Sequence, residues 1–268
     1  MKVNVVDISK NKVKEMELPS HFNEILRPDL IKRSVLSMQS KKRQPYGAMP
    51  EAGKRSSAKL SRRRRDFKGS YGFGISRVPR KILSGKGSRW NWVGAFAPGT
   101  VGGRRAHPPK ADKKFEKKIN KKEGKKAMRS AIAATMNKEA VKQRGHLIPE
   151  DYPFILDGKF ESLDKTKAVK EILGKLGFEA ELKRVEVKKI RAGKGKLRGR
   201  KYKTKKGPLI IVSSESSIIK SAKNIPGVDV IEVKKLNIEA LAPGTVPGRA
   251  SLWTKEAIEK LGKENLFM

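Results

Sequence analysis

The stretch LIIVSSESSIIKSAKNIPGVDVIEV, residues 209–233, decides the fold. Residues 209–212 are a continuous apolar run and predict a strand. Residues 216–227 predict a short helix, and residues 228–233 predict a second strand. Strands that alternate with helices along a chain become parallel neighbours, so this stretch predicts a parallel sheet flanked by helices.

The same alternation continues on both sides of this stretch. Further strands are expected at residues 1–9 and 152–158, and helices at 27–40, 123–145, 163–177 and 253–262. Residues 181–190 fit either a strand or a helix. The predicted fold class is therefore α/β, a single globular domain whose mainly parallel sheet is flanked by helices.

Two local predictions concern the ends of these helices. Asp164 is the expected N-cap of the helix over 163–177. Trp253 is expected to anchor the last helix on the body. Leu252, Ile258 and Leu261 follow a helical stripe beside it and are expected in the core.

The chain is strongly basic and has no cysteine. Its 268 residues include 64 Lys and Arg against 27 Asp and Glu, a formal net charge of +37. Like charges repel on one folded surface, so a polyanion is the natural partner. The longest apolar run has about five residues, whereas a membrane span needs about 20. No signal peptide is expected, and disulfides and thiolate metal sites are excluded. A cytoplasmic location is expected.

The positive charge concentrates between residues 41 and 110. This segment has nineteen Lys and Arg against two acids, with eleven glycines and six prolines. A loop longer than about 15 residues is functional or disordered. We expect residues 1–40 and 111–268 to form the globular domain and 41–110 to be an extended RNA-penetrating loop, with a second basic loop at about 190–207. Free in solution the long loop is expected to be disordered, because it buries little apolar area.

Two motifs in these segments favour RNA. SRRRRDFKGSYGFG, residues 61–74, combines arginines, whose planar forks match phosphate, with aromatic rings on which unpaired bases stack. A solvated disordered tail or a targeting patch would carry few aromatics and no folded flanks. RAGKGKLRGRKYKTKK, residues 191–206, lacks the G-x-G-x-x-G spacing of a dinucleotide site and precedes a strand, so a second RNA-clamping loop is favoured.

The sequence offers no catalytic or metal-binding pattern. His21, His107 and His146 are scattered, no H-x-x-x-H or G-x-S-x-G motif occurs, and the carboxylates neighbour lysines at helical spacing. We therefore expect no enzyme activity, no cofactor and no metal. Residues 97–106 and 242–250 share the pattern APGTV followed by glycine and arginine; the repeat fits either two similar turns or two phosphate cradles.

Several long motifs resemble one known family. GGRRAHPPK (102–110), RSAIAAT (129–135), IRAGKGKLRGR (190–200), KNIPGVDVIEVKKLN (223–237) and LAPGTVPGRASLWTKEAIEKL (241–261) resemble the archaeal and eukaryotic-type protein L four family of the large ribosomal subunit. RPDLIKRSVLSMQS followed by QPYG is similar to the family's N-terminal helix and loop entry. The resemblance covers nearly the whole chain, in the family's order.

The resemblance implies a structural role in the ribosome. The family has a globular α/β domain and a long loop that threads into large-subunit ribosomal RNA. The loop tip lines a constriction of the nascent-peptide exit tunnel beside another ribosomal protein. By position, the tip falls on Gly72, Phe73, Gly74, Ile75 and Arg77; Ile75 replaces an expected arginine, a charge that Arg77 or Arg80 can supply. The implied partners are ribosomal RNA and neighbouring ribosomal proteins, with no membrane and no homo-oligomer.

The residues expected to contact RNA lie in the two basic segments. They are Arg55, Lys59, Arg62, Arg63, Arg64, Arg65, Lys68, Tyr71, Phe73, Arg77, Arg80, Lys81, Lys86, Arg89, Trp90, Trp92, Arg104, Arg105, His107, Lys110, Lys194, Lys196, Arg198, Arg200, Lys201 and Lys203. Two other functions stay open from the residues alone: a DNA-compacting or other architectural nucleic-acid-binding protein, and an RNA-processing enzyme.

Overall fold

The structure is a computed structural model that describes residues 1–87 and 89–268. The chain divides into two compact units. The body comprises residues 1–42 and 116–268, and the extension comprises residues 43–115.

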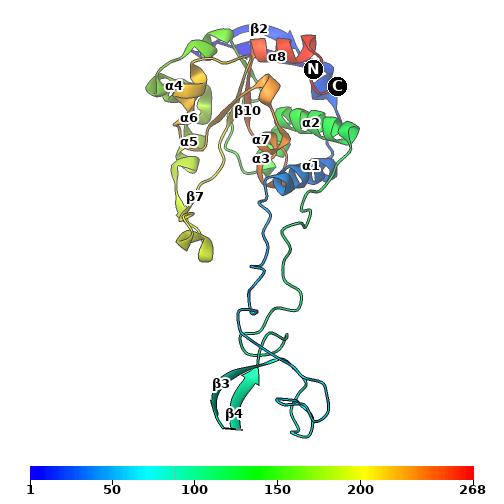
Figure 1. Cartoon of the computed structure of the whole chain (residues 1–268). Helices are drawn as coiled ribbons and strands as arrows, with labels where there is room; N and C mark the ends of the chain where they lie inside the picture. Colours follow the sequence, from blue (N-terminus) through cyan, green and yellow to red (C-terminus); the bar gives the residue numbers. More distant parts are fainter. Residues whose placement is uncertain (88) are drawn as a thin grey trace. The chain divides into compact units, whose positions relative to one another are not determined.

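The body is built on a six-stranded sheet (Figure 1). Its strands are β1 (Lys2–Val6), β2 (Lys12–Glu17), β5 (Ile155–Leu156), β8 (Leu209–Val212), β9 (Asp229–Glu232) and β10 (Ser251–Thr254), in the order β2-β1-β5-β10-β8-β9. Only the β1–β2 pair is antiparallel; the other pairs are parallel. The predicted α/β class with a mainly parallel sheet is confirmed.

Helices cover both faces of this sheet. They are α1 (Pro28–Lys41), α2 (Lys121–Met136), α3 (Lys138–Gln143), α4 (Thr166–Leu173), α5 (Glu179–Glu186), α6 (Ile218–Lys223), α7 (Ile238–Leu241) and α8 (Lys255–Lys263). Short 3₁₀ segments lie at Ser20–Asn23, Gly158–Ser162, Lys194–Leu197, Val233–Lys235 and Pro243–Thr245, and a π-helical turn at Gly174–Phe178. Figure 1 shows α4, α5 and α6 on one side of the sheet and α1, α2 and α7 on the other.

Strand β8 explains why its sequence is apolar throughout. Leu209 and Ile211 pack into the core on the face of α1, α2 and α8, whereas Ile210 and Val212 pack into the core against α4, α5 and α6. Side chains of a strand alternate between faces, so an interior parallel strand that is covered on both sides favours apolar residues at every position. All four side chains are fully buried.

The predictions for the last helix are confirmed. Leu252, Trp253, Ile258 and Leu261 have no exposed surface. The Trp253 ring packs edge-on against Phe22, with 5.2 Å between ring centroids. This aromatic contact ties the end of β10 to the N-terminal part of the body.

Three local predictions were wrong or incomplete. The helix expected over 123–145 is interrupted at Asn137, whose extended backbone and side chain cap α3 by accepting hydrogen bonds from the amides of Glu139 and Ala140. Asp164 is not a cap, because α4 begins two residues later, after Lys165. The strand expected over 152–158 narrows to Ile155–Leu156, and residues 181–190 form the end of α5 and then β6 (Lys189–Ile190).

A fully buried arginine joins three elements of the body. Arg249 Nε donates to the carbonyl oxygen of Gly207 at 2.9 Å, and Nη1 donates to that of Ala240 at 2.9 Å. Nη2 donates to Asp229 Oδ2 at 2.6 Å. The planar guanidinium therefore links the approach to β8, the start of β9 and α7, a geometry that lysine cannot reproduce.

Arg249→Ala is expected to lower the free energy of unfolding of the body by about 2–4 kcal/mol, because it removes the donor from the Gly207 and Ala240 carbonyls and one of the two cations from the half-buried Asp229 carboxylate. The measurement is urea unfolding followed by far-ultraviolet circular dichroism. Arg33→Ala is the matched control, because this exposed arginine pairs only with Glu123 at 3.2 Å and should cost less than about 1 kcal/mol. Equal unfolding midpoints for the two variants would contradict the assigned role.

Candidate nucleic-acid interface

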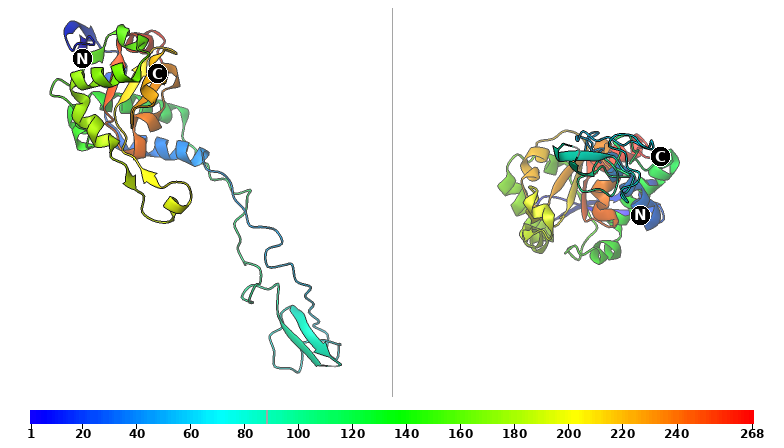
Figure 2. Two further views of the ribbon diagram at one scale, coloured as in Figure 1. Left: turned by 90° about the vertical axis from the view of Figure 1, so that its left-hand side faces the viewer. Right: turned by 60° about the horizontal axis from the view of Figure 1, so that its bottom comes forward.

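The extension contains a β-hairpin that sequence reasoning missed (Figures 1 and 2). Strand β3 (Arg80–Lys86) pairs antiparallel with β4 (Arg89–Gly94). Trp92 lies opposite Ile82, and Trp90 lies opposite Gly85. The sequence RWNWVG alternates with a period of two, which is the signal that could have revealed the strand.

The two tryptophans of β4 share one face of this hairpin and are half-buried. A Cβ on Gly85 would lie 2.6 Å from the Trp90 ring, so glycine is required there for the ring to lie across β3. Lys68 Nζ lies 3.9 Å from the centroid of the Trp90 ring, and Phe67 meets that ring edge-on at 6.2 Å. Neighbouring side chains of the extension therefore cover part of the Trp90 ring, and both tryptophan rings stay partly exposed.

The four consecutive arginines lie on the segment beside β3. The isolated bridge of Lys59 with Arg80 places this segment next to β3, and the bridge of Ser61 with Gly69 closes the segment on itself. Ser61 donates a hydrogen bond to Asp66, and this bond lowers the pKa of the Asp66 carboxyl. Arg62, Arg63, Arg64 and Arg65 are all exposed.

The positive charge of the extension is almost without counter-charge. Within residues 43–87 and 89–115, the ion pair of Arg55 with Glu51 at 3.7 Å is the only one closer than 4 Å. The predicted contact residues are mostly exposed: Arg55, Lys59, Arg77, Lys86, Arg89, Arg105, His107 and Lys110 are exposed, and Lys68, Arg80, Lys81 and Arg104 are half-buried. Such a surface attracts an anion along its whole length.

The predicted loop tip combines two left-handed glycines with exposed rings. Gly72 has φ +83° and Gly74 has φ +64°, a conformation that favours glycine. Phe73 between them is 69% exposed, and Ile75 is half-buried. Arg77 Cζ lies 4.6 Å from the centroid of the Tyr71 ring, so the guanidinium covers one face of that ring.

The second basic loop belongs to the body. Strand β6 pairs with β7 (Tyr202–Lys203), and the 3₁₀ turn Lys194–Leu197 lies between them. The six predicted contact residues Lys194, Lys196, Arg198, Arg200, Lys201 and Lys203 are all exposed. In the described part of the chain none of these six lies within 4 Å of a carboxylate.

A buried ionic network holds the base of this loop. The Glu181 carboxylate is fully buried and accepts hydrogen bonds from His146 Nδ1 at 2.7 Å, the Leu147 amide at 2.9 Å and Arg184. Arg184 also donates to the carbonyl oxygen of Lys206 at 2.9 Å. Burial raises the pKa of Glu181, but the hydrogen bonds from Arg184, His146 and Leu147 outweigh it and lower the pKa to about 2.

The repeated APGTV motif separates into two different roles. Gly99 and Gly244 both have positive φ, +85° and +78°, which supports the interpretation of both copies as turns. Arg249 in the second copy donates its hydrogen bonds to groups inside the body, whereas Arg105 in the first copy is exposed. The second copy therefore stabilises the body and is not a phosphate cradle.

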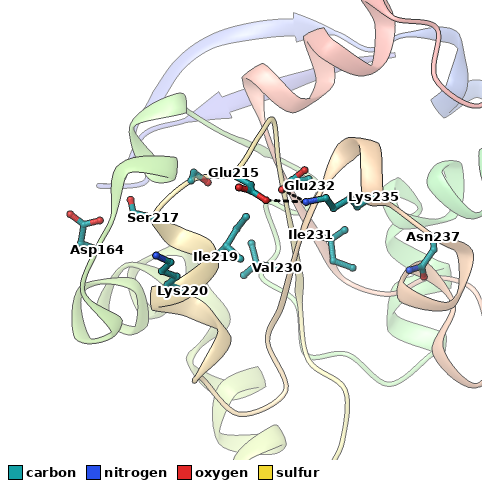
Figure 3. A pocket seen from close by; sticks show the side chains of 11 residues that line it. Asp164, Glu215, Ser217, Ile219, Lys220, Val230, Ile231, Glu232, Lys235 and Asn237 are labelled. Atoms are coloured by element: carbon teal, nitrogen blue, oxygen red, sulfur yellow. Dashed lines mark hydrogen bonds and ion pairs between the residues drawn. The ribbon is translucent and has the colours of Figure 1, made fainter.

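A cleft of the body does not suit a phosphate. It has a volume of about 840 Å³ and lies between α6 and β9 (Figure 3). Its wall carries Glu215 and Glu232, which bind Lys235 Nζ at 3.1 Å and 2.9 Å. Among residues 1–87 and 89–268 no three metal-ligating side chains cluster, and no helix is long and apolar enough to span a membrane.

Fold and surface together define a basic α/β protein with two exposed, cation-rich segments. Comparison with known proteins makes this class specific: residues 16–264 match the Ribosomal protein L4/L1 family, and the chain belongs to this family.

Its curated relatives match over nearly their full length. The chain is 50% identical to the large ribosomal subunit protein uL4 of Nanoarchaeum equitans over 268 residues, 100% of both chains. It is 47% identical to the protein of that name from Methanosphaera stadtmanae, over 97% of this chain and 96% of the relative. For Archaeoglobus fulgidus the identity is 45%, over 98% and 99%.

Glu181→Gln is expected to lower the free energy of unfolding by about 3 kcal/mol at pH 7, since a pKa lowered from 4.5 to about 2 corresponds to that amount. In the unsubstituted protein this contribution is full above pH 4.5 and is lost as the pH falls through about 2. Urea unfolding between pH 7 and pH 2 measures it.

Glu179→Gln is the matched control on the same helix, because Glu179 is exposed and pairs only with Lys183 at 2.8 Å. It should change the free energy of unfolding by less than about 1 kcal/mol. The network has no such role if the two variants have the same stability at pH 7.

Proposed function

We propose that this chain is a structural constituent of the large ribosomal subunit and binds its ribosomal RNA through the extension and the second basic loop. The observation that carries the proposal is the exposed, unpaired positive charge of both segments. Membership of the Ribosomal protein L4/L1 family and full-length relatives named large ribosomal subunit protein uL4 support it. The proposed location is the ribosome in the cytoplasm.

The mechanism is electrostatic and structural. Exposed arginines such as Arg62–Arg65 place planar forks where RNA phosphates approach, and each contact releases condensed counterions. Residues 41–110 penetrate between RNA helices, and residues 190–207 clamp the RNA at the body. No catalytic step is part of this function.

Aromatic rings add contacts that phosphate binding cannot supply. Phe73 and Tyr71 are exposed, and both are proposed to stack on unpaired bases. Trp90 and Trp92 stiffen the hairpin and offer their exposed edges to RNA. The cations over these rings, Arg77 over Tyr71 and Lys68 over Trp90, bring positive charge to the same places.

The tip of the extension is proposed to reach the wall of the nascent-peptide exit tunnel. Gly72, Phe73, Gly74, Ile75 and Arg77 form this tip, where Arg77 supplies the charge that Ile75 lacks. A neighbouring ribosomal protein shares the constriction, and the nascent peptide passes both. The chain acts as a single copy in the particle.

Deleting residues 50–105 is expected to leave the body folded and to lower the affinity for a large-subunit ribosomal RNA transcript at least tenfold, because fifteen of the nineteen Lys and Arg of residues 41–110 are lost. The deletion can close the chain, since the Ala48 amide already bonds to the Pro109 carbonyl at 2.9 Å. Filter binding measures affinity and circular dichroism checks folding. Equal RNA affinity of the deletion would refute the proposal.

Two variants that each lose four positive charges distinguish the contribution of the extension to RNA affinity from that of the chain's overall charge. The fourfold alanine variant of Arg62–Arg65 is expected to reduce the slope of log affinity against log salt by about 3, with 0.7–0.9 per phosphate contact. The control replaces the exposed lysines Lys167, Lys170, Lys175 and Lys183 of the body with alanine. Its slope should change by less than about 1.

A further inference from the structure

A cleft lies within the extension, where Arg105, His107 and Lys110 are predicted RNA contacts but Tyr46 and Asp112 are not. It has a volume of about 750 Å³ and is lined by Tyr46, residues 105–110, Asp112 and Lys113. Clefts of about 300–1,000 Å³ hold small ligands, so this one is large enough for a single nucleotide.

One wall of the cleft is a fixed aromatic platform. The Tyr46 ring stacks on Phe115 with 5.6 Å between centroids and 15° between planes. Arg43 Cζ lies 4.2 Å from the centroid of the Phe115 ring and 5.5 Å from that of Tyr46. Tyr46 is nevertheless 52% exposed, so the stack holds the ring in place while leaving surface for another flat group.

The two chain segments that form the cleft are held together by the backbone. The Ala48 amide donates to the Pro109 carbonyl at 2.9 Å. A Cβ on Gly47 would lie 3.0 Å from the Ala111 nitrogen, so glycine allows this close approach. Pro108 and Pro109 also line the cleft, and their rings restrict the backbone there.

The charges around the cleft are of two kinds. Arg105, Lys110 and Lys113 supply cations for a phosphate, and Arg105 and Lys110 are exposed. Asp112 is the one carboxylate that lines the cleft in the described chain. A carboxylate only accepts hydrogen bonds, so it selects a base that offers donors.

We propose that this cleft binds one unpaired guanosine nucleotide of RNA. The base stacks on Tyr46, a phosphate binds Arg105 and Lys110, and Asp112 accepts hydrogen bonds from the adjacent N1–H and N2–H groups. Among the RNA bases only guanine presents two adjacent donors on its Watson–Crick edge; adenine and cytosine present a ring acceptor there, and uracil presents one donor between two oxygens. This site rests on the proposed RNA-binding function and gives it a base-specific contact.

The test uses the full chain and two RNA hexamers, UUGUUU and UUUUUU, measured by fluorescence anisotropy. Backbone contacts are the same for both, so the ratio of their affinities isolates the base contact. The expected preference for the guanine hexamer is about 5- to 150-fold, the range of one bidentate base contact. A central 6-thioguanosine is expected to crosslink to Tyr46 on irradiation.

Three variants decide the assignment. Tyr46→Ala should bring the ratio close to one, and Tyr46→Phe should keep it. Asp112→Asn should bring the ratio close to one, and the lost negative charge should raise the affinity for both hexamers alike. The near-isosteric Asp112→Asn and Tyr46→Phe variants preserve the local structure. An unchanged ratio in Tyr46→Ala or Asp112→Asn overturns the guanosine site.

The result also separates this site from the function on which it rests. A chain that binds the ribosomal RNA transcript but does not distinguish the two hexamers overturns the guanosine site alone. A chain that binds neither the transcript nor the hexamers overturns both proposals.

Discussion

The repulsion among the cations of the extension governs the rest of the molecule. Residues 41–110 carry nineteen Lys and Arg against two acids. Within the described residues of the extension, Ala95 is the only buried apolar side chain. Fixing the backbone costs about 1–2 kcal/mol per residue, which one alanine and a hairpin cannot offset. The indole nitrogen of Trp90 and Nε of Arg80 are also buried without a partner among these residues. An external polyanion therefore has to stabilise residues 49–108, whereas the chain on either side is joined by the Ala48–Pro109 hydrogen bond and the stack of Tyr46 on Phe115.

The body, in contrast, is stabilised by its own apolar cores. Its sheet is covered on both faces, and its interior strand β8 is apolar at every position. Burial of the apolar side chains in the two cores offsets the conformational entropy lost on folding. The buried charges of Arg249 and Glu181 each have several hydrogen-bond partners. Arg184 and Arg249 hydrogen-bond to the backbone at Lys206 and Gly207, where the second basic loop ends. The exposed cations of this loop are therefore attached to a stable part of the body.

Sequence reasoning reached the fold because its signals are local. Residues 209–233 specify a strand, a helix and a strand by apolar runs alone, and the structure reproduces all three. It missed the hairpin of β3 and β4, although the alternation of RWNWVG is a local signal for β4. It could not find the stack of Tyr46 on Phe115, because these residues lie 69 positions apart. Asp164 has the right chemistry for a cap, but α4 begins too late to use it. Exposed cations were predictable from charge; the cleft geometry was not.

The central claim is that the extension gains its stable arrangement from RNA. Amide hydrogen exchange tests it most directly, on β3 and β4 of the free chain and of the chain bound to the ribosomal RNA transcript, with β8 and β10 as internal references. The account predicts fast exchange of the hairpin amides in the free chain and strong slowing on RNA binding, while β8 and β10 stay protected in both. Hairpin amides that are as protected as those of β8 in the free chain would contradict it.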